Sequence, residues 1–147
     1  MKYKKLLPIL FFLVVLIFAF IFFQNYSIHG NRLENIKING NELKIEIVNS
    51  SEKLSEGLGE RDGLCDKCGM LFEFSEKERH SFWMKGMRFN LDIIWIDGNE
   101  IVHIAKNISH NSSETIMPEV KADKVLEIKG GLADRIGIKA GDVVEFK

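Results

Sequence analysis

Two cysteines separated by two residues form the most reactive pair in the sequence. Cys65 and Cys68 could form a disulfide, carry out thiol–disulfide exchange or bind a soft metal ion. Exchange usually relies on a helix N-terminus to lower the pKa of the attacking thiol, but the residues after Cys68 alternate like a strand. We therefore predict a local disulfide if the domain lies outside the cytoplasm, with thiol redox chemistry as an alternative.

Copper(I) is the alternative cofactor for this pair. Met84 and Met87 follow in a nearby segment, and thioether and thiolate sulfur together favour copper(I). Methionines also fill cores, and the chain has no second Cys-x-x-Cys pair to complete a zinc finger. The main prediction is therefore that the protein has no metal and no cofactor.

A second group of residues combines charged side chains with tryptophan. Asp92 interrupts the apolar run of residues 91–96, and a buried carboxylate needs a partner. Lys85, Arg61 or Arg88 could supply the opposite charge. The pattern therefore predicts either an internal ion pair or the charged floor of a pocket.

The functional interpretation places several of these side chains around one cleft. We expect Arg61, Trp83, Lys85 and Asp92 to bind a small polar or anionic ligand, such as a sugar. Glu127, in another strand pattern, could pair with one of the cations or face water. The alternative is structural, with a loop anchored by salt bridges and tryptophans that belong to the core or its rim.

Period-two alternation dominates the secondary-structure pattern and indicates a β-rich domain. Short helices are predicted within residues 49–59 and 132–137, and a charged turn at 75–79. Strands are predicted at 41–48, 69–74, 81–84, 90–96, 100–107, 124–131 and near residue 146, with a hairpin turn at 97–99. The expected fold is mainly β (α+β), a single small domain with a mostly antiparallel, closed or half-open barrel-like sheet.

Five phrases in this order resemble one family. They are GLGERDGL (57–64), GMLFEF (69–74), SFWMK (81–85), LDIIWID (91–97) and VLEIKGGLADRIGIKAGDVV (125–144). The chain resembles the bacterial and archaeal family called domain of unknown function 192, also uncharacterised protein family 0127. The resemblance implies a small β-rich domain, often secreted or membrane-tethered, with no established activity. Gly86, Met87 and Asn90 depart from the Asn-Thr pair and proline that the family commonly has there.

The N-terminus predicts a membrane anchor. Residues 6–23 are uncharged and apolar, and 18 residues of helix are roughly 27 Å long, close to the thickness of a bilayer core. A cleavable signal peptide is the alternative, but no small-x-small site follows the run. The lysines at positions 2, 4 and 5 would stay in the cytoplasm, so we expect a single-pass protein of the cytoplasmic membrane with its C-terminal domain outside.

The predicted organisation is an anchor at 1–24, a linker at 25–40 and an extracytoplasmic domain at 41–147. After the three N-terminal lysines the chain carries 17 basic and 21 acidic residues, which argues against nucleic acid as a partner. No Ser-His-Asp order, phosphate loop or HExxH motif is visible. We therefore expect a binding or accessory module, with a small ligand or another cell-envelope component as its partner, rather than an enzyme.

Overall fold

A computed structural model describes residues 31–146 and Val15. The predicted anchor lies outside the described residues apart from Val15, and no helix within the described part is long and apolar enough to cross a bilayer. The folded domain begins at Arg32.

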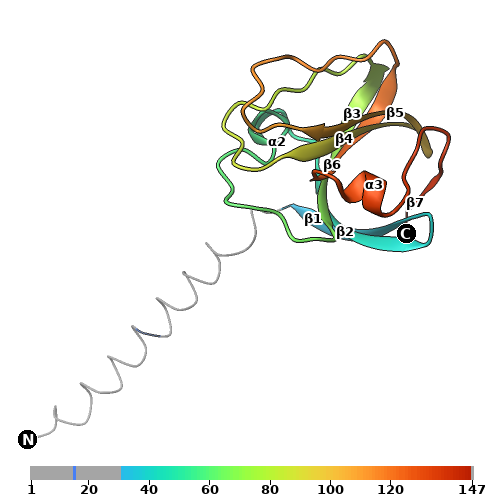
Figure 1. Cartoon of the computed structure of the whole chain (residues 1–147), viewed down its shortest axis with the longest axis horizontal. Coiled ribbons are helices and arrows are strands. Elements are labelled where there is room, and N and C mark those ends of the chain that lie inside the picture. The colour runs from blue at the N-terminus through green and yellow to red at the C-terminus, as the bar shows by residue number, and fades with distance from the viewer. Residues whose placement is uncertain (1–14, 16–30, 147) are drawn as a thin grey trace, which may run out of the picture. The chain divides into compact units, whose positions relative to one another are not determined.

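Seven strands and two short helices make up the domain (Figure 1). The elements are β1 (Arg32–Ile38), β2 (Asn41–Val48), α2 (Ser51–Glu56), β3 (Cys68–Glu78), β4 (Leu91–Asp97), β5 (Glu100–Ile108), β6 (Ala122–Lys129), α3 (Leu132–Arg135) and β7 (Val144–Phe146). The prediction of a mainly β domain with two short helices is therefore confirmed.

The strands form one sheet in the order β5-β4-β6-β3-β2-β1-β7. Among the neighbouring strands of the described chain, only β2 and β3 run parallel, and all other pairs are antiparallel. The expectation of a mostly antiparallel sheet is therefore confirmed. The two ends of the sheet approach each other where Glu100 bridges to Val143 and the Val144 amide donates to the Asn99 carbonyl at 2.8 Å. The sheet is therefore a half-closed barrel, and this contact covers part of its edges.

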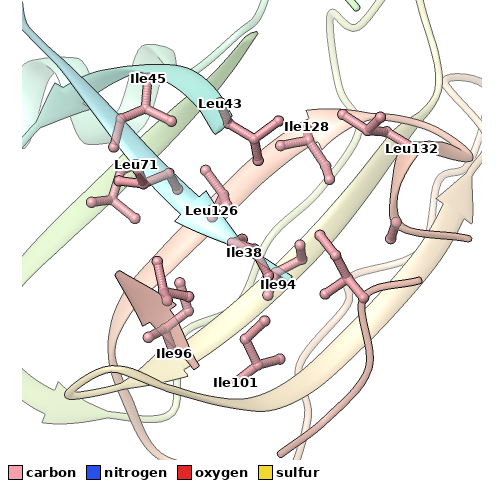
Figure 2. Packing of buried hydrophobic residues seen from close by; sticks show 14 of the residues in the cluster. Ile38, Leu43, Ile45, Leu71, Ile94, Ile96, Ile101, Leu126, Ile128 and Leu132 are labelled. Atoms are coloured by element: carbon pink, nitrogen blue, oxygen red, sulfur yellow. The ribbon is translucent and has the colours of Figure 1, made fainter. Parts of the chain in front are cut away.

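One hydrophobic core fills the inside of the curved sheet (Figure 2). Alternate residues of β2, namely Leu43, Ile45 and Ile47, point into it because successive strand side chains face opposite sides. Leu132 of α3 and Ile138 pack against the same core. The helix α3 therefore covers the interior of the sheet.

A second core lies on the outer face of β3, β4 and β6. Phe72, Trp95 and Val125 point outwards from these strands and are buried beneath Leu58 and Met84. These strands are thus covered on both faces, which explains why their sequences contain long apolar runs. The segments that cover this outer core also form the walls of the pocket described below.

Three details of the sequence prediction are corrected. The strand β1 occupies part of the predicted linker at 25–40, because Ile36 and Ile38 reach the core through a tight hairpin. That turn is Asn39-Gly40, both with positive φ (50° and 74°), as a type I′ turn requires. The predicted charged turn at 75–79 is mostly a continuation of β3, and the predicted strand at 81–84 forms only one bridge, from Phe82 to Ile116.

Candidate functional site

A cavity of about 260 Å³ opens on the outer face of the sheet. The helix α2 and the turn after it form one wall through residues 54–59. Phe72 and Phe74 of β3 and the segment 79–87 form the others, and Glu127 of β6 completes the lining. The lining therefore combines apolar and aromatic side chains with a comparable number of polar and charged ones. Such a mixture can hold a ligand that has both a hydrophobic face and polar groups.

Glu127 is the buried polar group of this pocket. Its side chain is 5% exposed, and its Oε2 atom has no hydrogen-bond partner among the described residues. Burial raises the pKa of this carboxyl to about 8, and the positive charge of Arg61 opposes the rise only in part. At neutral pH the side chain is therefore mainly a neutral carboxylic acid, which can donate one hydrogen bond and accept others.

His80 supplies a second polar atom without a partner. Its Nε2 atom is buried and forms no hydrogen bond within the described chain. The ring stacks on Phe74 with 3.5 Å between ring centroids, and the His80 carbonyl accepts a hydrogen bond from Nε1 of Trp95 at 3.0 Å. The sheet therefore fixes the imidazole in the pocket wall with this nitrogen buried.

The rim of the pocket carries an aromatic ring and two cations. Trp83 is 54% exposed although its side chain is large and apolar. Lys85 is exposed beside it in the sequence, and Arg79 pairs with Glu119 at 2.8 Å. An exposed indole and an ammonium group at the mouth give an entering molecule a flat apolar surface and a positive charge.

Arg61 does not line the pocket but lies close enough to act on its carboxyl. The guanidinium donates from Nη1 and Nη2 to the two carboxylate oxygens of Glu46, at 2.6 and 2.9 Å. This pairing raises the pKa of Arg61. The predicted role of Arg61 as a lining residue of the cleft is therefore corrected: it forms a bidentate ion pair next to the pocket.

Asp92 faces the opposite side of the sheet from Glu127. Its Oδ1 accepts from the amides of Asn107 (2.7 Å) and Gly131 (3.0 Å), and its Oδ2 accepts from the amide of Ala133 (2.7 Å). The side chain is fully buried and points to the inside of the sheet, like that of Ile94 two residues further along β4. The expectation that Asp92 pairs with a cation in the cleft is therefore wrong, because backbone amides satisfy its carboxylate.

Three of the five predicted site residues thus line one pocket: Trp83, Lys85 and Glu127. That they bind a ligand stays a prediction. Sequence reasoning did not place Arg79 or His80 in the cleft: Arg79 ends the predicted charged turn at 75–79, and His80 follows it. The half-buried ring of His80 stacks against Phe74, a contact for which the sequence carries no signal.

Cys65 and Cys68 form a disulfide in the structure, next to the start of β3. Met84 is buried in the outer core and Met87 packs against it, which is the core-filling role that methionine often has. No group of three His, Cys, Asp or Glu side chains in the described residues is placed to hold a metal ion. Thiol exchange and copper binding stay predictions.

The fold and the site together define a half-closed β-barrel module with a pocket built around a buried carboxyl. The chain belongs to the DUF192 family, described as "Uncharacterized ACR", since the family model matches residues 34–146. No curated protein matches the chain.

Two solved structures share the fold. A putative transcription regulator from Sinorhizobium meliloti 1021 is 27% identical, with a TM-score of 0.76 over 79% of this chain and 95% of that one. A protein of unknown function from Novosphingobium aromaticivorans DSM 12444 is 30% identical, with a TM-score of 0.76 over 82% of this chain and 89% of that one.

Proposed function

We propose that this protein is a membrane-anchored, extracytoplasmic module that binds a small polar or anionic ligand in the pocket around Glu127. The observation that carries the proposal is a cavity of about 260 Å³ lined by Glu127, a buried residue whose Oε2 has no hydrogen-bond partner among the described residues. A buried polar group without a partner costs roughly 1–3 kcal/mol. A ligand that forms this hydrogen bond would offset the cost.

The charges around the pocket favour some ligands over others. A neutral carboxylic acid at position 127 can donate to a ligand hydroxyl, carbonyl or carboxylate oxygen. Lys85 at the rim attracts negative charge and repels ammonium groups. Trp83 offers a ring face on which the apolar side of a sugar ring could stack. These features support neutral polar and anionic ligands over cationic ones.

The two tryptophans make ligand binding measurable. Trp95 is fully buried and Trp83 is 54% exposed, so a molecule that enters the pocket should change mainly the emission of Trp83. We would titrate the full chain in detergent with N-acetylglucosamine, glucuronate, inorganic phosphate and, as the cationic probe, choline. A saturable change with a neutral or anionic probe, and none with choline, is the expected result.

Glu127→Leu provides the decisive variant, because leucine has a similar size but lacks the polar atoms of glutamate. Its affinity for the same probe should fall about tenfold or more, the equivalent of one lost hydrogen bond of about 1.4 kcal/mol. Glu114→Gln, at an exposed position outside the pocket lining, is the control and should bind normally. Equal binding by the Leu variant, or no response to any probe, would contradict the proposal.

A further inference from the structure

One cation acts on two carboxyls that lie on the outer face of the sheet. Arg61 makes two hydrogen bonds to Glu46, and its charge also acts on Glu127. We propose that Glu46 is a positioning residue, which holds the guanidinium of Arg61 and thereby leaves the carboxyl of Glu127 open to a ligand. This inference deepens the proposed function and rests on it for the role of the pocket.

The strand register places the two carboxyls in one row. Glu46 of β2 is opposite Met70 of β3, and Met70 is opposite Glu127 of β6. Residues opposite one another share a face, so both glutamates and Met70 point outwards. With strands about 4.8 Å apart, the two glutamate backbones are separated by about 10 Å. An arginine that holds one of these carboxyls is therefore near enough for its charge to act on the other.

The bidentate geometry explains why Arg61 pairs with Glu46. Two parallel N–H···O bonds between a guanidinium and a carboxylate form one of the strongest polar contacts in proteins. The side chain of Glu46 is 15% exposed, so an ion pair with Arg61 there carries a smaller desolvation cost than one at the more deeply buried Glu127. Arg61 thus neutralises one carboxylate, and the other remains protonated and without a hydrogen-bond partner at Oε2.

Other titratable groups around the pocket are less able to take over this role. Lys85, Arg79, His80 and Glu56 also line it, but the charge that acts on Glu127 is that of Arg61. Arg79 is already paired with Glu119. Glu56 also attracts Arg61, but it is exposed to water, which weakens such pairs. If Glu46 loses its charge, the nearby buried acceptor for Arg61 is Glu127.

The test is the pKa of Glu127 in the free protein, measured on its side-chain carboxyl by ¹³C NMR. In Glu46→Gln, Arg61 should turn to Glu127, and the pKa of Glu127 should fall by about 1 to 3, as it does for a carboxylate beside an arginine. The double variant Glu46→Gln/Arg61→Gln should restore a value of about 8 or higher. Glu119→Gln breaks a different Arg–Glu pair in the pocket wall and is the matched control, with no change expected.

A second measurement uses the unaltered chain and does not depend on the folding of a variant. The guanidinium NMR signals of Arg61 should keep the pattern of a bidentate pair while the pH passes through 8 and Glu127 ionises. If the signals show that Arg61 moves to Glu127 in this range, or if Glu46→Gln leaves the pKa of Glu127 unchanged, the positioning role is refuted.

Ligand titrations separate this inference from the proposed function. If Glu46→Gln lowers the pKa of Glu127 and weakens probe binding about tenfold, both stand. A lowered pKa with no probe bound by the unaltered chain would overturn the binding function but keep the positioning contact. If the unaltered chain binds a probe but Glu46→Gln leaves the pKa of Glu127 unchanged, the binding function stands and the positioning role of Glu46 is overturned.

Discussion

Glu127 and Asp92 lie on adjacent strands, yet the hydrogen-bond environments of their carboxyls differ. Three backbone amides satisfy Asp92 inside the barrel, whereas Oε2 of Glu127 has no partner within the described residues. Both side chains are 5% exposed or less, so burial alone does not distinguish them. Asp92, which has hydrogen-bond donors, therefore has a structural role, whereas Glu127, whose Oε2 has none among the described residues, remains available to a ligand.

The raised pKa of Glu127 predicts how stability depends on pH. An unfolded glutamate releases its proton near the ordinary value of 4.5, whereas the folded side chain keeps it until about pH 8. Folding therefore takes up a proton between these values, and rising pH opposes folding by at most about 1.4 kcal/mol per pH unit. This contribution is fully present below pH 4.5 and is lost progressively up to pH 8.

Glu127→Gln should remove that slope, because glutamine does not titrate. Urea unfolding at pH 5, 6, 7 and 8 would measure the free energy of unfolding for both proteins, and the other titrating groups cancel in the comparison. The advantage of the unaltered chain over the variant should shrink steadily from pH 5 to pH 8. A constant difference across this range would show that Glu127 titrates normally.

Asp92→Asn should destabilise the fold without affecting the pocket. The amide oxygen can replace Oδ1, but an NH₂ group then faces the Ala133 amide, which Oδ2 now satisfies at 2.7 Å. The loss of a charged acceptor and a buried unpaired N–H should cost about 2–4 kcal/mol in urea unfolding. Asp134→Asn is the control, since this side chain is 66% exposed in its pair with Lys106 and should contribute little. A cost for Asp92→Asn as small as that of the control would contradict the capping role.

The two acidic residues also mark how far sequence reasoning reaches at this scale. The acidic interruption at Asp92 indicates that a partner is needed, but amides of Asn107, Gly131 and Ala133 carry no side-chain signature that could name them. Trp83 and Lys85, which were expected in one cleft, both line the pocket, and Glu127 lines it with them. Glu46 has the pattern of an outward polar position of a strand, and its contact with Arg61 depends on segments brought together only by the fold.

At the scale of elements, β3 and β6 form the floor of the site and approach each other closely at Gly69. A Cβ atom there would lie 2.8 Å from the Glu127 carbonyl oxygen and 3.0 Å from side-chain atoms of Leu126 and Ile128. The carbonyl oxygen cannot move without shifting the strand that carries the pocket carboxyl. The glycine is thus required by a close backbone approach rather than by an unusual φ.

Gly69→Ala should therefore destabilise the domain by about 1–3 kcal/mol, the usual cost of overpacking. It should also shift the carboxyl NMR signal of Glu127, whose backbone carbonyl meets the new methyl group. Gly63→Ala is the matched control, because its added methyl group would have no neighbouring atom within 4 Å and its φ is ordinary. Equal stability for the two variants would mean that the strands separate without cost.

Element prediction succeeded where alternation is regular and failed where pairing is non-local. The strand at 41–48 and the hairpin around residues 97–99 were both correctly predicted from alternation and an Asp-Gly turn. The strand β1 was missed because only Ile36 and Ile38 alternate within a polar segment. The continuation of β3 into its charged end depends on partners in β6, such as Ala122 opposite Glu78. Local patterns therefore identify half-buried strands but not how far a strand extends.

At the scale of the whole molecule, the barrel-like fold followed from the strand pattern, whereas the location of the domain rests on the sequence alone. An apolar stretch at 6–23 of roughly 27 Å as a helix is long enough to stay in a bilayer. A disulfide between Cys65 and Cys68 persists where the surroundings are oxidising, which fits a domain outside the cytoplasm. Location and redox state are therefore linked and can be tested together.

The full chain expressed in bacteria should remain in the membrane fraction after carbonate extraction, with both cysteines protected from alkylation until a reductant is added. This outcome is expected if the apolar segment anchors the chain in the bilayer and the lysines before it stay in the cytoplasm, as we propose. A variant that lacks residues 6–23 is the control, and it should be soluble with both thiols alkylated in the reducing cytosol. A mature N-terminus beyond residue 24 would instead identify a cleaved signal peptide, and a soluble full chain with two reactive thiols would refute the anchor and the exterior location together.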